Sequence, residues 1–230
     1  MIEKRPFAKL GHADHGWLDA HHHFSFAEYR DPARMSWGNL RVWNDDQIAA
    51  GSGFPAHPHR DMEIVTYVRQ GAITHRDSLG NEGRTEAGDV QVMSAGSGIT
   101  HSEYNLEGVE TRLFQIWILP DAAGGAPDWG ARPFPKADRS GRFVTLASGF
   151  EDDGDALRIR AHARVLGATL RKGESLSYDL GEGRHAYLVP SEGAIDGVRL
   201  DARDGAAIRD MPSIQIQAIE DSELVLVDAA

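Results

Sequence analysis

Two pairs of potential metal ligands, each spaced i and i+2, constrain the fold of this chain more than any other feature. His57 and His59 stand in H-P-H, and His101 and Glu103 stand in H-S-E. A strand turns every second side chain to the same face, so each pair can point at one ion. Pro58 favours an extended backbone at His57, because the residue before a proline is pushed out of the helical region. The two pairs predict one mononuclear metal centre inside a small β-barrel.

The rest of the sequence favours antiparallel strands. Glycine accounts for 25 of the 230 residues, above the usual share of about 7%, and it recurs at turn-like places between short apolar runs. The runs are I-V-T-Y-V at 64 to 68, L-F-Q-I-W-I-L at 113 to 119, A-Y-L-V at 186 to 189, I-Q-I-Q-A-I at 214 to 219 and E-L-V-L-V at 223 to 227. No long helical period competes with them. The sequence therefore predicts an all-β fold.

An internal echo predicts two related barrels in tandem. The run Y-V-R-Q-G-A-I ending at Ile73 is similar to L-V-P-S-E-G-A-I ending at Ile195. The segment 121 to 141 is rich in Gly, Pro and Ala, shows no convincing strand and is the expected connection. We place the boundary near residue 138, which gives an N-terminal domain 1–138 and a C-terminal domain 139–230. Nine of the 11 histidines precede Glu110, so the metal site is expected in the first barrel only.

Composition excludes several classes of protein. The chain has no cysteine, which rules out disulfides and thiolate metal sites. Its net charge of -11, without a compensating basic cluster, opposes direct nucleic-acid binding. No segment of the sequence resembles a secretory signal or is apolar enough to span a bilayer, so no membrane association and a cytoplasmic location are expected.

Longer motifs around the two pairs carry a family resemblance. H-P-H-R-D-M-E-I-V-T-Y-V, taken with S-A-G-S-G-I-T-H-S-E-Y-N, resembles the pirin family, particularly its bacterial quercetin 2,3-dioxygenase-like members. The resemblance implies two cupin barrels of the jelly-roll, or double-stranded β-helix, type. It also implies one metal, usually iron, held by four residues of the N-terminal barrel: His57, His59, His101 and Glu103. In many other cupins the first-motif glutamate is the ligand, which makes Glu63 the rival of Glu103; the H-S-E pair favours Glu103.

The atoms of the four potential ligands limit which metals can bind. Three nitrogens and one oxygen suit iron(II), manganese, nickel or copper, and an ion that is five- or six-coordinate would keep open positions. A closed zinc site that only braces the barrel is the structural alternative, although such sites usually recruit cysteine.

The pirin resemblance implies that the chain is an oxidoreductase that opens quercetin, or a similar flavonol or enolisable aromatic compound, with dioxygen. Glu103, the only anionic ligand, is a hypothetical acceptor for the substrate hydroxyl proton if it loosens from the metal. The main alternative is a non-enzymatic, iron-binding pirin that acts as a redox-sensitive transcription cofactor through a protein partner. A cupin isomerase or sugar-binding protein is a third interpretation, and it would require a polar pocket.

Other histidines and the tryptophans favour structural roles. The consecutive His21, His22 and His23 alternate faces in a strand and cannot easily converge, and His22 is the one expected to be buried. His75, in T-H-R-D, is expected to be a partly exposed strand residue. Four tryptophans could line an aromatic pocket but more often form core in a β-protein: Trp17, Trp37, Trp43 and Trp117.

Overall fold

The chain is almost entirely β-structure, as predicted. The computed structural model describes residues 1–192, 195–196 and 199–230. Its helices, within these ranges, are three short 3-10 turns: η1 (Phe7–Lys9), η2 (Pro32–Arg34) and η3 (Lys136–Arg139). None of the helices in this part of the chain is long and apolar enough to cross a membrane.

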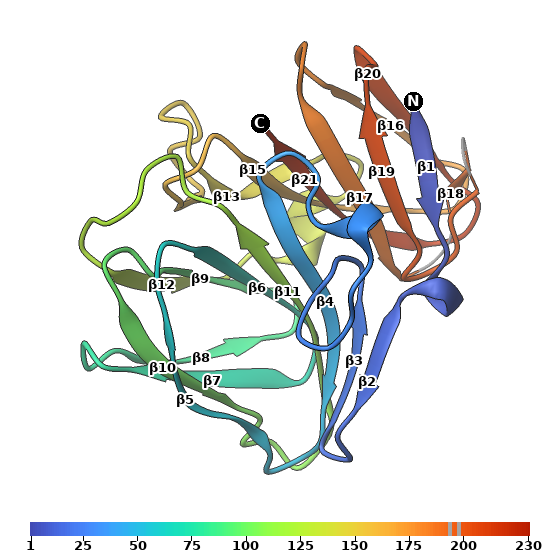
Figure 1. Ribbon diagram of the computed structural model, residues 1–230. Helices are drawn as coiled ribbons and strands as arrows, with labels where there is room; N and C mark the ends of the chain where they lie inside the picture. The colour runs from blue at the N-terminus through green and yellow to red at the C-terminus, as the bar shows by residue number, and fades with distance from the viewer. Residues whose placement is uncertain (193–194, 197–198) are drawn as a thin grey trace.

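The first barrel consists of a seven-stranded and a four-stranded sheet (Figure 1). In spatial order the larger sheet contains β12 (Asp128–Arg132), β9 (Val90–Ser94), β6 (Glu63–Gln70), β11 (Thr111–Ile118), β4 (Leu40–Ile48), β3 (Leu18–His22) and β2 (Gly11–Asp14). The smaller sheet contains β5 (Gly53–His59), β10 (Ile99–Tyr104), β7 (Ala72–Asp77) and β8 (Glu82–Glu86).

The second barrel repeats this plan with a seven-stranded and a three-stranded sheet, which confirms the predicted tandem arrangement. Its larger sheet contains β1 (Ile2–Arg5), β19 (Gly205–Arg209), β17 (His185–Glu192), β21 (Ser222–Ala229), β15 (Arg164–Leu170), β13 (Val144–Ser148) and β14 (Leu157–Arg158). Its smaller sheet contains β16 (Ser175–Asp179), β20 (Ser213–Ala218) and β18 (Ile195–Asp196). Gly193, in the run L-V-P-S-E-G-A-I, is one of the glycines where a turn is expected, and it lies outside the described residues.

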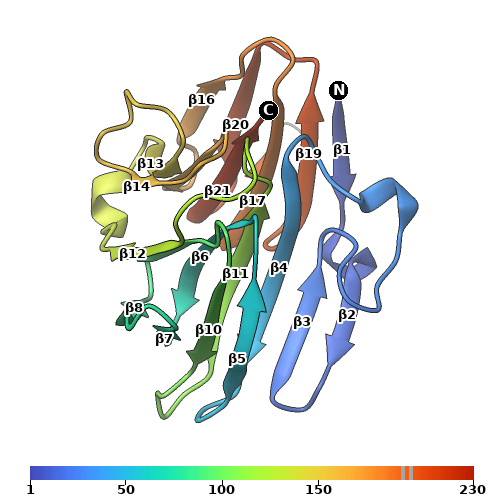
Figure 2. The same ribbon diagram turned by 60° about the vertical axis from the view of Figure 1, so that its left-hand side comes forward.

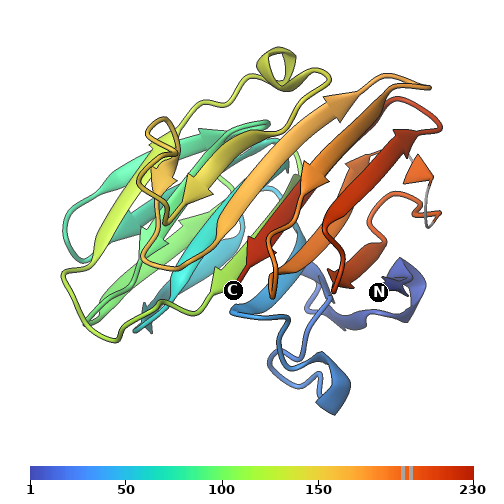
Figure 3. The ribbon, with the colours of Figure 1, turned by 90° about the horizontal axis from the view of Figure 1, so that it is seen from above.

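The two large sheets pack against each other, so their central strands, such as β6 and β21, are buried on both faces. One core cluster joins residues of β6 and β11, such as Tyr67 and Phe114, to residues of β17 and β21, such as Tyr187 and Val227. A strand covered on both faces has apolar residues at successive positions. This explains the composition of the runs I-V-T-Y-V and E-L-V-L-V. Figure 3 shows the two halves side by side, the N-terminal one blue to green and the C-terminal one orange to red.

Two strands differ from the sequence-based expectations: β1 in the barrel it joins, and β12 in being a strand at all. β1 pairs antiparallel with β19 at the edge of the second barrel, although it opens the segment assigned to the N-terminal domain. The side chain of Arg5 holds it there, because its guanidinium lies 5.1 Å from the ring centre of Phe24 and 5.4 Å from that of Tyr187. The segment 121 to 141 was expected to lack strands, yet it contains β12 (Figure 2), which pairs with β9. A boundary near residue 138 stays a prediction.

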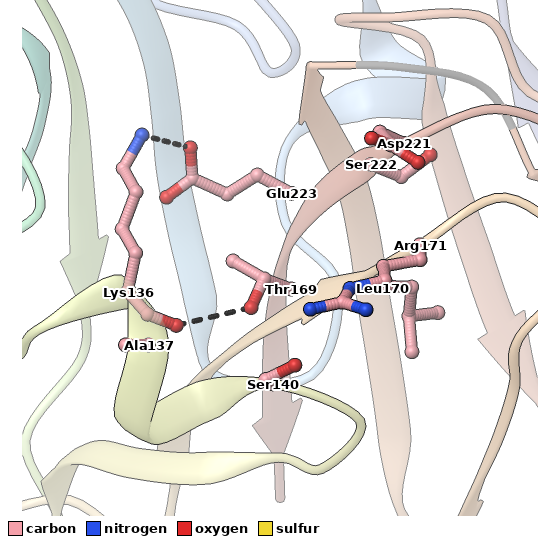
Figure 4. Close-up of a pocket in the computed structure, with 9 residues that line it drawn as sticks. All are labelled: Lys136, Ala137, Ser140, Thr169, Leu170, Arg171, Asp221, Ser222 and Glu223. Atoms are coloured by element: carbon pink, nitrogen blue, oxygen red, sulfur yellow. Dashed lines mark hydrogen bonds and ion pairs between the residues drawn. The ribbon is translucent and has the colours of Figure 1, made fainter.

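The end of the connection is tied to the second barrel by polar contacts (Figure 4). Thr169 Oγ1 donates to the Lys136 carbonyl at 3.0 Å, and Lys136 Nζ lies 2.7 Å from a carboxylate oxygen of Glu223. Glu223 is 3% exposed and also accepts from the hydroxyl of Tyr67 in the first barrel. A buried carboxylate therefore links both barrels and the connection.

Candidate metal centre

The two ligand pairs lie on adjacent antiparallel strands of the small sheet. β10 pairs with β5 so that His101 lies opposite His57, and the register shifts between His101 and Glu103. On its other side β10 pairs with β7, which places Asp77 opposite His101 and His75 opposite Glu103. Residues far apart in the sequence therefore meet on three neighbouring strands.

The three predicted histidines converge. Nitrogen atoms of His57, His59 and His101 lie within 4.8 Å of one another, and the Nε2 atoms of His57 and His101 are 3.1 Å apart. Burial, with smaller contributions from neighbouring histidines, lowers the pKa of His59 to about 4 and that of His101 to about 2. These two imidazoles are therefore neutral at neutral pH, the form that binds metal.

Glu103 lies inside the barrel beside this cluster. Its carboxylate accepts hydrogen bonds from Gln91 Nε2 at 2.6 Å and from Gln115 Nε2 at 2.7 Å, and a longer one from Thr66 Oγ1 at 3.4 Å. Burial raises the pKa of Glu103 to about 7, although these hydrogen bonds lower it. Its nearest candidate co-ligands are His101 and His75, within 4.8 Å. The four predicted ligands thus form one region, with His101 at its centre.

The three histidines fit one transition-metal ion, and Glu103 adjoins them through His101. Two nitrogens bound at about 2.0–2.1 Å and at about a right angle would lie about 3 Å apart, close to the 3.1 Å between the His57 and His101 Nε2 atoms. His57 Nδ1 lies 2.7 Å from the Pro55 carbonyl and donates to it, so its Nε2 lone pair is free. Imidazole and carboxylate donors without thiolate suit iron, nickel, copper or manganese.

The rival carboxylate, Glu63, lies elsewhere in the barrel. Its Oε2 accepts from Ser94 Oγ at 2.5 Å, and burial raises the pKa of its carboxyl. Among the residues that the structure describes, it does not group with the site histidines as a potential ligand. This placement supports Glu103 over Glu63, and the ligand assignment stays a prediction.

The predicted exposure of His75 is wrong. It was expected to be partly exposed, but it is 0% exposed and stacks on Trp129 of β12, with ring centres 4.7 Å apart and planes at 9°. Its Nδ1 lies 3.3 Å from His101 Nδ1, and its Nε2 lies 3.0 Å from Asp77 Oδ2. His75 and Asp77 share the i, i+2 spacing of the two ligand pairs, so the same signal could have found them.

The consecutive histidines do not converge on one another, as expected. His22 is buried and lies 2.8 Å from the Asn44 side-chain oxygen, whereas His23, also buried, lies 2.8 Å from the Tyr187 hydroxyl. His21 instead joins His12 and Asp19 in a more exposed group on the β2–β3 hairpin.

One aromatic residue, Trp117, links the metal centre to a cavity. Trp117 contacts His59, with ring centres 4.9 Å apart, and also contacts Phe26. It lines a cavity of about 290 Å³ together with Ser25, Phe26, Ala27, Tyr29, Arg30, Arg41, Val42 and Met62. A shallower recess is lined by His59 itself, with Arg60 and Thr100.

The other tryptophans behave as structural residues. Trp43 is fully buried core, and Trp37 donates to carbonyl oxygens of the second barrel. Trp17 packs edge-on against Phe54.

A separate cavity, of about 320 Å³, lies at the seam between the connection and the second barrel (Figure 4). Its charged groups include Lys136 and Glu223, which pair with each other. No histidine lines it, so we place the site at the histidine cluster.

The chain is similar to known proteins over both barrels. The pirin family model matches residues 3–118, and a model described as a quercetinase C-terminal cupin domain matches residues 145–229. A pirin-like protein of Caulobacter vibrioides is 69% identical over 100% of both chains. The quercetin 2,3-dioxygenase of Escherichia coli K12 is 42% identical over 99% of this chain and 98% of its own.

Solved structures agree as well. The crystal structure of the bacterial pirin YhhW from Escherichia coli in complex with nickel(II) superimposes with a TM-score of 0.93 at 42% identity, covering 100% of this chain and 99% of that one. Both barrels are therefore of the cupin type, and the chain belongs to the pirin family.

Proposed function

We propose that this protein is a metal-dependent dioxygenase that opens quercetin or a similar flavonol with dioxygen. The observation that carries the proposal is the convergence of three histidines on one point, next to a buried carboxylate and an aromatic cavity. A relative 42% identical over nearly the whole chain bears the name quercetin 2,3-dioxygenase, and a 42% identical structure contains nickel(II).

Each group has a role in this proposal. His57, His59, His101 and Glu103 would hold one transition metal, most simply iron(II), which when bound would acidify the flavonol hydroxyl and orient the substrate. Phe26, Tyr29 and Trp117 supply aromatic surface for a planar substrate. The cavity they line is near the lower end of the roughly 300–1,000 Å³ typical of small-molecule sites.

Glu103 is the proposed proton acceptor. Gln91 and Gln115 each donate to one of its carboxylate oxygens, and the carboxylate would accept the proton once it loosens from the metal. Glu103→Gln keeps the size of the side chain but removes the basic carboxylate, and it should abolish turnover. A Glu103→Gln variant with bound metal and full activity would eliminate this role.

The decisive experiment is a turnover assay. The metal-free protein is loaded separately with iron(II), manganese, nickel or copper, supplied with quercetin and oxygen, and followed for flavonol loss together with carbon monoxide release. We expect stoichiometric release of carbon monoxide with at least one metal. Absence of turnover with all four would sink the dioxygenase proposal and favour the non-enzymatic alternative.

A further inference from the structure

We propose that Asp77 and His75 form a hydrogen-bond relay that fixes the tautomer of His101 and so leaves its Nε2 free for the metal. The inference rests on the metal centre proposed above and not on flavonol chemistry. His75 and Asp77 are positioning residues in this scheme, because they act on the ion through His101.

The relay begins at a carboxylate that only accepts. Asp77 Oδ1 accepts from the backbone amides of Leu79 at 2.9 Å and Asn81 at 3.1 Å, and Oδ2 accepts from Asn81 Nδ2 at 2.9 Å. His75 Nε2 is the fourth neighbour, 3.0 Å from Oδ2. A carboxylate surrounded by donors has no proton to give, so His75 Nε2 must carry the proton and donate it.

The proton on Nε2 determines whether Nδ1 of His75 donates or accepts. A neutral imidazole has one N–H, so Nδ1 of His75 can only accept. The atom facing it, 3.3 Å away, is Nδ1 of His101, which must therefore donate. His101 is then unprotonated at Nε2, the atom that lies 3.1 Å from His57 Nε2. His57 Nε2 is also an acceptor, so a neutral N–H···N bond from His101 Nε2 competes with the relay, but that bond would cost the stronger, charge-assisted bond between His75 and Asp77.

Rigid packing protects the relay. His75 is 0% exposed, so water does not compete for its nitrogens. Trp129 covers its ring, and Gly83 makes room for that indole, because a Cβ on Gly83 would come within 2.1 Å of it. The connection strand β12, which carries Trp129, thereby completes the support of a metal ligand. Partners of this kind orient ligating histidines in many metal sites.

A direct ligand role for His75 is the competing arrangement. His75, His101 and Glu103 also have potential ligand atoms within 4.8 Å. An ion there would need Nδ1 of His101, which faces His75, and would not use the Nε2 that faces His57. The two arrangements therefore demand opposite tautomers of His101.

Asp77→Asn is the most discriminating variant. Its amide oxygen can keep the bonds from Leu79 and Asn81, which turns the NH₂ group toward His75 Nε2. His75 then carries its proton on Nδ1, His101 must accept at Nδ1, and its proton moves to Nε2, where it blocks the metal. The matched control is Asp153→Asn, which changes a hydrogen-bonded carboxylate that belongs to none of the groups of potential metal ligands among the described residues.

The test has two readouts that do not depend on catalysis. Nitrogen-15 NMR of the metal-free protein should show His101 protonated at Nδ1 in the wild type and in Asp153→Asn, and at Nε2 in Asp77→Asn. Calorimetric titration with nickel(II) should show about a 10- to 100-fold weaker affinity for Asp77→Asn and no change for Asp153→Asn. His75→Phe, which removes the acceptor, should also weaken nickel binding.

Three outcomes would overturn the relay: wild-type His101 protonated at Nε2, unchanged nickel affinity in a folded Asp77→Asn, or loss of binding in His75→Phe without any tautomer change in Asp77→Asn. If Asp77→Asn does not fold, the wild-type tautomer alone decides. Lack of quercetin turnover would count against the proposed function and leave the relay standing.

Discussion

β10 of the first barrel and β20 of the second occupy comparable positions in their small sheets but bury different side chains. Each pairs with a strand on either side in its small sheet and alternates between buried and more exposed residues. The buried positions of β10 are Ile99, His101 and Glu103, whereas those of β20 are Ile214, Ile216 and Ala218. The same backbone pattern therefore carries ligands in one barrel and only apolar side chains in the other.

The large sheets differ in the same way. The inner face of the first barrel presents Thr66, Gln91 and Gln115, which hold Glu103. The inner face of the second barrel presents residues such as Leu188 and Leu226, which belong to an apolar cluster. A buried carboxylate is costly unless its oxygens are hydrogen-bonded. Acquiring or losing a metal centre in this fold thus requires a change in the supporting glutamines as well as in the ligands.

The largest expected effect is on metal content. His57→Ala should reduce bound metal from about one ion per chain to nearly none, because it removes a ligand from a set that has no spare imidazole in the same position. His162→Ala, a histidine substitution in the second barrel, should leave metal content unchanged. Both are measured by elemental analysis after loading with nickel(II) and desalting. Full retention by His57→Ala would place the centre elsewhere.

The next largest effect is on stability, through the buried ion pair where the two barrels and the connection meet. Glu223→Ala should lower the free energy of unfolding by about 3–5 kcal/mol, because it leaves buried positive charge without its partner. That charge belongs to Arg139, which is 0% exposed and lies 3.6 Å from Glu223. The measurement is urea-induced unfolding. Glu220→Ala, at an exposed glutamate nearby, should change stability by no more than about 0.5 kcal/mol, and similar losses in both variants would contradict the assigned role.

Sequence alone predicted the parts of this architecture that local pattern determines. The i, i+2 pairs placed His57, His59 and His101 together, and continuous apolar runs marked strands covered on both faces. The pairing of β1 with the second barrel was not predictable, because it depends on Arg5 stacking on rings about 20 and 180 residues away in the sequence. β12 has a glycine and one large apolar residue, too little for a strand signal.

The supporting side chains were the hardest to foresee. Gln91 and Gln115 are single polar residues within apolar runs, and only the closed barrel turns them toward Glu103. His75 carried a usable signal in its spacing from Asp77, but its burial depends on Trp129 from the connection.

Metal addition should stabilise the first barrel more than the second. An ion that binds only the folded state stabilises it by about 2.7 kcal/mol at 100 times its dissociation constant. Hydrogen exchange in β5 and β10 should slow accordingly when nickel(II) is added, because these strands carry the predicted ligands. Exchange in β16 and β20 should change less. Equal protection in all four strands would mean that the two barrels open as one unit.

The smallest expected effect, per group, is the pH response of the metal-free protein. Burial lowers the pKa of His59 to about 4, so the folded state excludes a proton that the unfolded chain accepts below about pH 6.5. Each such histidine removes up to about 1.4 kcal/mol of stability per unit as the pH falls from 6.5 toward its folded pKa. His101, with a pKa of about 2, acts in the same direction over a wider range.

Glu103 opposes this trend. Its pKa, raised to about 7, makes the folded state lose stability as the pH rises from about 4.5 to 7, so it offsets one histidine in that window. His59, His75 and His101 all have lowered pKa values, and the net effect remains destabilisation of the first barrel by acid. Hydrogen exchange of β5 and β10 at pH 7 and pH 5, with a chelator present, should reveal it. Because the interior of the second barrel is apolar, β16 and β20 should respond less, and an equal response would show that the buried histidines are not its source.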